Sequence, residues 1–312
     1  MNQRLTLPTA MLLTVPPLLW AGNAVVGRAV ADLIPPMALN FLRWVIAFAI
    51  LLPLTWRVLQ SQSSVWKNWR RYALLGLLGV GCYNALMYLA LHTSTPLNVT
   101  LVGASMPLWM LTTGALFFGQ RISRRQVAGA VLSMAGVLVV LSRGQLAWLA
   151  NIHFVPGDFY MVLASISWAF YSWHLFQPAG RPPKDSPEIR SDWTAFLMAQ
   201  MVFGLGWSGA LAGGEWALTY ANANTHASAY ISWGWPLIAA LAYVAMGPAI
   251  LAYRCYGLGV QRAGPAIAGF FSNLTPLIAA VLSATFLGEL PHLYHAAAFV
   301  LIAGGIVVSA SK

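Results

Sequence analysis

Long apolar runs dominate the chain, and short segments with charged residues, glycine or proline separate them. Runs of this length are typical of membrane-spanning helices, because about 20 residues are needed to cross the hydrocarbon core of a bilayer. Treating each break as a helix boundary predicts ten spans. They cover residues 9–30, 37–59, 72–91, 96–118, 125–141, 157–176, 193–213, 233–256, 265–287 and 293–309.

One apolar stretch occurs twice. Residues 96–119 read PLNVTLVGASMPLWMLTTGALFFG, and residues 265–288 read PAIAGFFSNLTPLIAAVLSATFLG. Both copies begin with proline, carry a second proline near the middle and end with glycine, and matched positions lie 169 residues apart. Trp20-Ala21 in the first span is likewise matched by Trp168-Ala169 in the sixth. A span that is repeated on a fixed spacing indicates two homologous halves.

The number of spans predicts how the halves are related. Five spans per half is an odd number, so the second half enters the membrane from the opposite side. We expect residues 1–142 to form the first five-helix repeat, residues 143–156 to connect the halves outside the cytoplasm, and residues 157–312 to form the second repeat. The predicted fold class is therefore an all-α membrane protein with ten transmembrane helices in two inverted repeats, an arrangement suited to alternating access.

The basic residues set the expected orientation. If the spans alternate in direction, all but three of the 17 Lys and Arg residues lie on the side that holds both termini; the exceptions are Arg28, Arg43 and Arg143. Cytoplasmic loops carry the excess of Lys and Arg in membrane proteins. We therefore expect a multi-pass protein of the cell (inner) membrane whose N and C termini are both cytoplasmic.

Composition narrows the class further. Hydrophobic residues make up 59% of the chain and charged residues only 8%, which excludes a large soluble core. The net charge of +10 is accounted for by loop orientation and does not indicate nucleic-acid binding. Cys82 and Cys255 both lie inside predicted spans and offer neither a disulfide framework nor metal-ligand spacing. We expect no metal and no cofactor.

The sequence lacks the motifs of the common enzyme classes. It has no nucleophile elbow, no zinc-protease helix and no nucleotide-binding fingerprint, so we expect no enzyme activity. All seven acidic residues lie near span ends or in loops. Proton exchangers commonly hold a carboxylate within the membrane, so this distribution disfavours that mechanism and favours a neutral or zwitterionic substrate.

Aromatic and amide side chains near the span midpoints are the candidate binding residues. Trp and Tyr there lie far from the membrane interfaces where they usually gather, and their N–H and O–H groups need partners. Small polar residues inside spans also serve helix packing, and that alternative stays open. The candidates for substrate binding are Trp20, Asn23, Tyr83, Asn84, Tyr88, Trp109, Trp168, Tyr171, Tyr253 and Asn273.

Three prolines lie inside predicted spans: Pro107, Pro248 and Pro276. Each removes a backbone hydrogen bond and frees a carbonyl group. We expect helix breaks at these positions, with two interpretations open. The breaks either shape the bundle, or they take part in gating while the freed carbonyls accept a hydrogen bond from a substrate ammonium group.

Three charged residues lie around the first hairpin. Arg28 and Asp32 are four residues apart, and Arg43 lies a turn or two inside the second span. The favoured interpretation is a structural charge pair of Arg28 or Arg43 with Asp32. Snorkelling of Arg43, or binding of a substrate carboxylate by Arg43, are the alternatives.

The pattern resembles the drug/metabolite transporter superfamily, and within it the EamA family, over nearly the whole chain. The residues that carry the resemblance are Trp20 with Asn23, the Phe41-Leu42-Arg43 run, Pro107 and Pro276, Gly288-Glu289, and the helices containing Gly136 and Gly305. The resemblance implies a central cavity between two inverted five-helix repeats and export of small metabolites. Gln120 stands where the second repeat has Glu289, so no charge-based role is carried over to it.

The functional hypothesis follows from the resemblance and the aromatic spans together. The spans are similar to those of bacterial exporters of aromatic and other neutral amino acids, so we expect a secondary transporter that exports small neutral or zwitterionic metabolites, amino acids above all. Export of nucleosides, sugars or hydrophobic drugs is the alternative. The expected partners are the substrate and the lipid bilayer, without nucleic acid, and a monomer is among the oligomeric states that the sequence allows.

Overall fold

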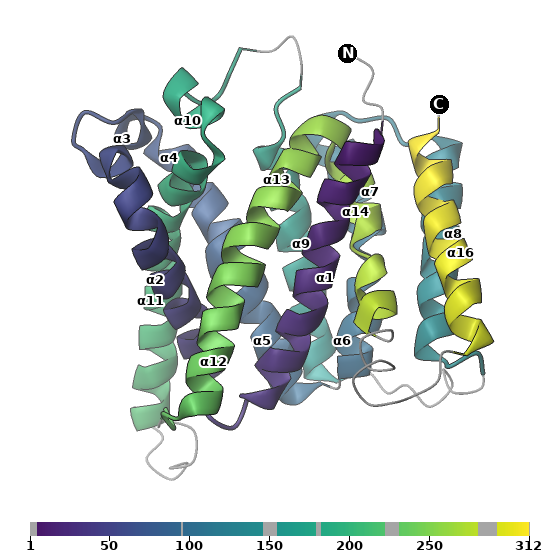
Figure 1. Cartoon of the computed structure of the whole chain (residues 1–312), viewed down its shortest axis with the longest axis horizontal. Helices are drawn as coiled ribbons and strands as arrows, with labels where there is room; N and C mark the ends of the chain where they lie inside the picture. The colour runs from purple at the N-terminus through teal and green to yellow at the C-terminus, as the bar shows by residue number, and fades with distance from the viewer. Residues whose placement is uncertain are drawn as a thin grey trace.

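The computed structural model describes residues 5–94, 96–145, 155–178, 182–221, 231–279 and 292–311. Throughout these residues the regular structure is helical, and long helices stand side by side (Figure 1). The start of α1 (Leu7–Ala29) and the end of α16 (Leu293–Ala310) lie at the same end of the bundle, which we call the terminal end (Figure 1). The opposite end is called the far end.

The described residues form ten helical segments that run along the bundle. Besides α1 and α16, four of them are single helices or end in a short turn of 3-10 helix: α2 (Pro36–Thr55) with η1 (Trp56–Leu59), α8 (Arg124–Leu141), α9 (Pro156–Leu175) and α11 (Trp193–Ala221). Two are continuous lines of three pieces: α4 (Trp69–Leu75), η2 (Gly76–Cys82) and α5 (Tyr83–Thr93), and α12 (Trp235–Val244), η4 (Ala245–Leu251) and α13 (Ala252–Ala263). The last two are each made of two pieces: α6 (Pro96–Gly103) with α7 (Met106–Phe118), and α14 (Pro265–Phe271) with residues 274–279. The short α3 (Ser64–Lys67) and α10 (Pro187–Ser191) lie at the terminal end (Figure 1).

Eight of the described segments are long and apolar enough to cross a membrane, and the segment from Pro265 to Ala279 is a shorter apolar one. The tenth segment, α9, is less apolar because Asp158 and several serines interrupt it. An aqueous protein would bury such surfaces, yet large apolar side chains such as Leu116 and Phe299 are more than half exposed. The prediction of an all-α membrane protein with ten helices in two inverted repeats is confirmed.

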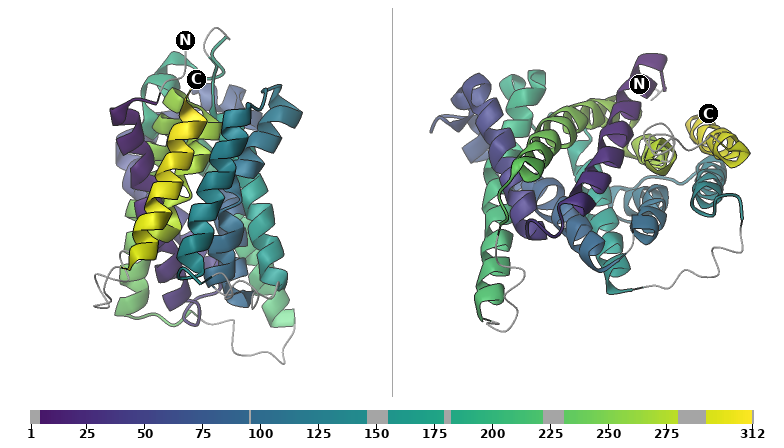
Figure 2. Two further views of the ribbon diagram at one scale, coloured as in Figure 1. Left: turned by 90° about the vertical axis from the view of Figure 1, so that its right-hand side faces the viewer. Right: turned by 60° about the horizontal axis from the view of Figure 1, so that its bottom comes forward.

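The last helices of the two repeats pack backbone to backbone. Figure 2 shows α8 and α16 side by side. A Cβ atom added at Gly129 would lie 2.6 Å from the carbonyl oxygen of Gly305, and one added at Gly305 would lie 2.6 Å from that of Gly129. Small residues at such a contact let membrane helices approach closely. Gly136 packs in the same way on the carbonyl of Ala298. By the spacing of 169 residues, Gly136 is matched to Gly305 and Ala298 is matched to Gly129. The contact of Gly136 with Ala298 is therefore the two-fold counterpart of the contact of Gly305 with Gly129.

Two helical segments widen into π-helix at matched positions. The η2 and η4 segments each span seven residues, and η4 begins and ends 169 positions after η2 does. A π-helical turn is rare, and it leaves backbone carbonyls of the helix available to other donors. Pro248 lies inside η4. The predicted spans 72–91 and 233–256 are therefore each interrupted near their centres.

The other two prolines begin helices. Residues 104 and 105 form a turn, and Pro107 then lies in the first helical turn of α7. Residues 272 and 273 likewise form a turn, and Pro276 lies in the helical segment that follows. A proline is well tolerated in a first turn because the N–H that it lacks has no partner within the helix there. The spans that contain these prolines are thus broken into two pieces, while a gating role stays a prediction.

Candidate functional site

Six aromatic rings meet in the middle of the bundle. Trp168 of α9 is 1% exposed, and its ring centroid lies 4.6 Å from that of Tyr83, 4.9 Å from those of Tyr171 and Tyr256, 5.2 Å from that of Trp20 and 5.4 Å from that of Tyr253. We call these six residues the central ring cluster. Edge-on and tilted contacts at such distances are favourable, because the positive edge of one ring meets the negative face of another.

The cluster lies where the two halves of the chain meet. Trp20 and Trp168, matched in the two halves, touch edge to face with an interplanar angle of 89°. Asn84 and Tyr253 are matched by the spacing of 169, and the Asn84 Nδ2 donates a hydrogen bond to the Tyr253 Oη at 3.1 Å. Residues related by an inverted repeat come together only near the symmetry axis. The cluster therefore lies on the axis between the repeats.

Carbonyls in the two π-helical segments accept hydrogen bonds from side chains. Tyr253 Oη donates to the Gly79 carbonyl of η2, and Trp20 Nε1 donates to the Pro248 carbonyl of η4 at 3.4 Å. Gly79 and Pro248 are matched positions, so each half supplies a carbonyl to a ring of the other half. In this structure these acceptors are bonded to protein donors. Their proposed use for a substrate ammonium group stays a prediction.

A buried polar chain runs beside the rings. Arg43 of α2 donates through Nη1 to the Asn84 Oδ1 at 2.9 Å and to the Tyr88 Oη at 2.8 Å. Tyr88 in turn donates to the Asn23 Oδ1 at 2.8 Å. All four side chains are at most 2% exposed. This series of hydrogen bonds joins α1, α2 and α5, and it brings the predicted binding residues Asn23, Asn84 and Tyr88 into one network.

The predicted structural charge pair, of Arg28 or Arg43 with Asp32, is not seen among the residues that the structure describes. The side-chain ion pair that the structure describes joins Arg71 to Asp185. Arg43 points from the interior of α2 towards α5, whereas Asp32 lies in the turn before α2 begins. Arg28 donates instead to the Leu91 carbonyl at 3.1 Å.

Two predicted binding residues bond elsewhere. Trp109 is half-buried and donates to Ser105 of the turn that precedes its own helix, at 2.9 Å. Asn273 is buried and donates to Ser133 of α8 at 2.8 Å, which ties the break in the ninth span to α8. A binding role for either residue stays a prediction, and both have a structural partner.

Sequence reasoning missed two members of the site. Tyr256 follows Tyr253 by three residues, so helical periodicity places both on one face, and that signal was available. Trp44 is 0% exposed and its ring lies 5.0 Å from that of Tyr253. Its neighbour Arg43 lies on the adjacent side of α2, and nothing in the local sequence shows that both sides are buried.

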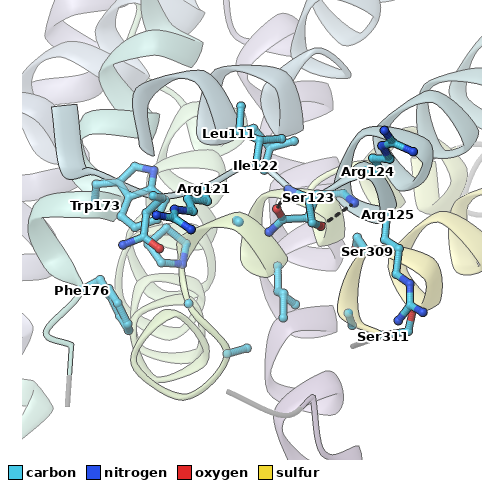
Figure 3. A pocket seen from close by; sticks show the side chains of 18 residues that line it. Leu111, Arg121, Ile122, Ser123, Arg124, Arg125, Trp173, Phe176, Ser309 and Ser311 are labelled. Carbon is cyan, nitrogen blue, oxygen red and sulfur yellow. Dashed lines mark hydrogen bonds between the residues drawn. The ribbon is translucent and has the colours of Figure 1, made fainter. Parts of the chain in front are cut away.

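A basic cavity of about 600 Å³ opens at the terminal end (Figure 3). Its walls come from the α7–α8 turn, the end of α9, the α13–α14 turn and the end of α16. Figure 3 labels three basic residues of its lining: Arg121 near Trp173, and Arg124 and Arg125 at the start of α8. The dashed lines there mark the cap of α8, in which Ser123 and Gln126 exchange hydrogen bonds between side chain and backbone.

A second hollow, of about 430 Å³, lies at the far end between α2 and α11. Apolar residues line most of it, together with Glu215. The Glu215 carboxylate accepts hydrogen bonds from the backbone N–H groups of Met37 (3.1 Å) and Ala38 (3.2 Å). A carboxylate at a helix N-terminus satisfies donors that have no partner within the helix, so Glu215 caps α2.

Comparison with known proteins places these features in a family. The chain matches the model of the EamA-like transporter family over residues 7–142 and again over residues 155–311. An uncharacterized transporter of Archaeoglobus fulgidus is 23% identical over 309 residues, which cover 97% of this chain and 98% of that protein. The uncharacterized transporter YyaM of Bacillus subtilis is 23% identical over 72% of this chain and 67% of its own.

Two further similarities bear on function and fold. A Salmonella typhimurium protein named "Probable amino-acid metabolite efflux pump" is 26% identical over 72% of this chain and 71% of its own. A solved crystal structure with a TM-score of 0.65 covers 96% of both chains at 22% identity, and at that identity the match describes the fold alone.

Proposed function

Since the chain belongs to the EamA-like transporter family, we propose that it is a secondary transporter that exports small zwitterionic metabolites, in particular amino acids with aromatic or other apolar side chains. The observation that carries this proposal is the central ring cluster with the buried polar chain beside it. The rings offer apolar and aromatic contact for a side chain, and the amide and phenol groups offer hydrogen bonds to a charged backbone.

The packing of the cluster bears on the transport cycle. The rings contact one another directly, so a substrate must separate rings of the two halves in order to bind. Relative movement of two repeats around a site on their symmetry axis is the general form of alternating access. We propose that the rings around Trp168 part when substrate enters and close again when it has left.

The terminal-end cavity is the proposed entrance for export. Basic residues concentrate at the terminal end, which the positive-inside rule assigns to the cytoplasm of the inner membrane. The cavity is lined by Leu111 and Trp173, on the helices that also carry Trp109 and Trp168. An opening on the cytoplasmic side supports export, and the name of the Salmonella relative supports amino acids as the cargo class.

Proteoliposomes provide the test. The purified chain is reconstituted, and flux is measured for labelled phenylalanine, leucine, uridine and glucose. We expect flux of the amino acids alone. Trp168→Phe should lower the flux of phenylalanine at limiting concentration by up to about tenfold, since the smaller phenyl ring loses part of aromatic contacts that are each worth up to about 1.5 kcal/mol. Trp235→Phe is the matched control, because Trp235 is 78% exposed, and it should leave the flux unchanged.

Two results would contradict the proposal. Flux of uridine or glucose without any flux of amino acids would make the chain an exporter of other metabolites. Equal losses in Trp168→Phe and Trp235→Phe would show that the central ring cluster has no special part in transport.

A further inference from the structure

Arg43 carries a positive charge into the centre of the bundle and keeps one side of its guanidinium group unbonded. The side chain is 0% exposed. Both N–H groups of Nη1 are used, by Asn84 and Tyr88. The Nε and Nη2 atoms are buried and have no hydrogen-bond acceptor. Buried donors without acceptors are rare and costly, so this edge of the group calls for an explanation.

The unbonded edge is the one that binds carboxylates. The N–H bonds of Nε and Nη2 run nearly parallel and match the two oxygens of a carboxylate. Arg71 of the same chain shows this geometry: its Nε lies 2.8 Å from one oxygen of Asp185, and its Nη2 lies 3.0 Å from the other. Arg43 therefore presents, at the centre of the bundle, the edge with which Arg71 holds Asp185.

No carboxylate of the described residues pairs with Arg43. Three acids near the helix interfaces have other partners: Asp158 accepts from Ser94 and Asn98, Asp185 pairs with Arg71, and Glu215 caps α2. The neighbours of Arg43 are neutral, and its guanidinium carbon lies 5.4 Å from the ring centroid of Trp44 and 6.0 Å from that of Tyr88. Such contacts offset only part of the cost of removing a charge from water.

The surrounding side chains hold this edge in place. The bonds from Nη1 to Asn84 and Tyr88 fix the plane of the guanidinium group. Asn84 is fixed in turn by its bond to Tyr253, a member of the central ring cluster. A pre-positioned donor pair next to aromatic rings suits a molecule with a carboxylate and an apolar body.

We infer that the Nε–Nη2 edge of Arg43 binds the carboxylate of the transported molecule. The inference rests on the proposed function and narrows its substrate class to compounds that carry a carboxylate. Asn84 and Tyr88 act as positioning residues for the guanidinium group. Amines, amides, sugars and other compounds without a carboxylate are excluded from tight binding.

Paired ligands test this inference. Thermal stabilisation of the purified full chain and counterflow in proteoliposomes are measured for phenylalanine and leucine, each against its amide, and for 3-phenylpropionate against 3-phenylpropionamide. We expect each carboxylate to bind about 10- to 100-fold more tightly than its amide, as a hydrogen-bonded charged group requires. The 3-phenylpropionate pair separates a need for the carboxylate from a need for the ammonium group.

Two variants connect the preference to Arg43. Arg43→Gln should abolish the preference for carboxylates over amides while amide binding changes little. Arg43→Lys keeps the charge but lacks the paired donors, so it should keep a reduced preference. If Arg43→Gln does not elute as a monodisperse protein, Arg43→Lys still tests the inference.

The outcomes separate this inference from the proposed function. If the wild-type chain moves amino acids and their amides equally well, the transport proposal stands and the role of Arg43 is overturned. If 3-phenylpropionate binds in an Arg43-dependent way but no amino acid is moved, the carboxylate site stands and the amino-acid proposal fails. The inference is also overturned if no carboxylate exceeds its amide, or if Arg43→Gln leaves the preference intact.

Discussion

Only one of two adjacent glycines of α16 should lose stability when it is replaced by alanine. A Cβ atom at Gly305 would lie 2.6 Å from the Gly129 carbonyl oxygen and 2.9 Å from the backbone nitrogen of Ser133, whereas one at Gly304 would meet nothing within 4 Å. Contacts with backbone atoms cannot be relieved by a rotamer change, so Gly305→Ala forces α8 and α16 apart by several tenths of an ångström. Gly304→Ala adds a methyl group in open space.

The size of the effect follows from these contacts. Overpacking costs about 1–3 kcal/mol, and replacing a helical glycine by alanine returns up to about 1 kcal/mol. We therefore expect Gly305→Ala to destabilise the protein by about 1–2 kcal/mol, which lowers Tm by about 2–8 °C. Gly304→Ala should leave Tm unchanged or raise it. Thermal unfolding of both purified variants in one detergent measures the difference.

The two substitutions are matched in chemistry and lie at adjacent positions of one helix, so differences in helix propensity cancel. A Tm for Gly305→Ala at or above that of the wild type would refute the reasoning. So would an equal loss of Tm in Gly304→Ala, because the loss would then not depend on the contact with α8.

Three further predictions concern polar groups that hold two helices or segments together. Asp185→Asn removes the charge that holds Arg71 at the terminal end and should cost about 3 kcal/mol in a denaturation experiment, while the exposed Arg70→Gln should cost little. Tyr253→Phe removes a donor to the Gly79 carbonyl and an acceptor for Asn84, and it should reduce stability by about 1–3 kcal/mol and slow flux in liposomes. Glu215→Ala uncaps α2 and should cost about 1 kcal/mol, with faster amide exchange of Met37 as the diagnostic readout; unchanged exchange would count against the cap.

The sequence predicted the fold well because a bilayer imposes one rule on every span. Ten apolar runs of sufficient length gave the helices, and the repeated stretch gave the inverted relation of the halves. The π-helical segments escaped prediction, because GLLGVGC reads as an ordinary apolar run. The side chains that bond its carbonyls come from other helices: Ser167 donates to Leu78, and Asn40 donates to Val80. Such donors are distant in the sequence.

The candidate site was predicted in part, for a related reason. Midspan position identified Trp20, Trp168 and Tyr253, which the structure brings together. It does not identify the helix face, so Trp109 and Asn273, chosen by the same criterion, bond elsewhere. The sequence favours Asp32 as the partner of Arg43 because the two residues are close along the chain. The hydrogen-bond partners in the structure, Asn84 and Tyr88, lie 41 and 45 residues from Arg43, and sequence spacing does not reveal such contacts.

The bond between Asn84 and Tyr253 has a consequence for how the halves diverged. A residue on a two-fold axis meets its own counterpart, so in an assembly of two identical chains the same side chain would have to face a copy of itself. Joining both copies in one polypeptide lifts that restriction, because each copy then mutates separately. An amide opposite a phenol is a pairing that two identical chains cannot form on their axis, and here the Asn84 of one half holds Arg43 while the other half supplies the Tyr253 ring.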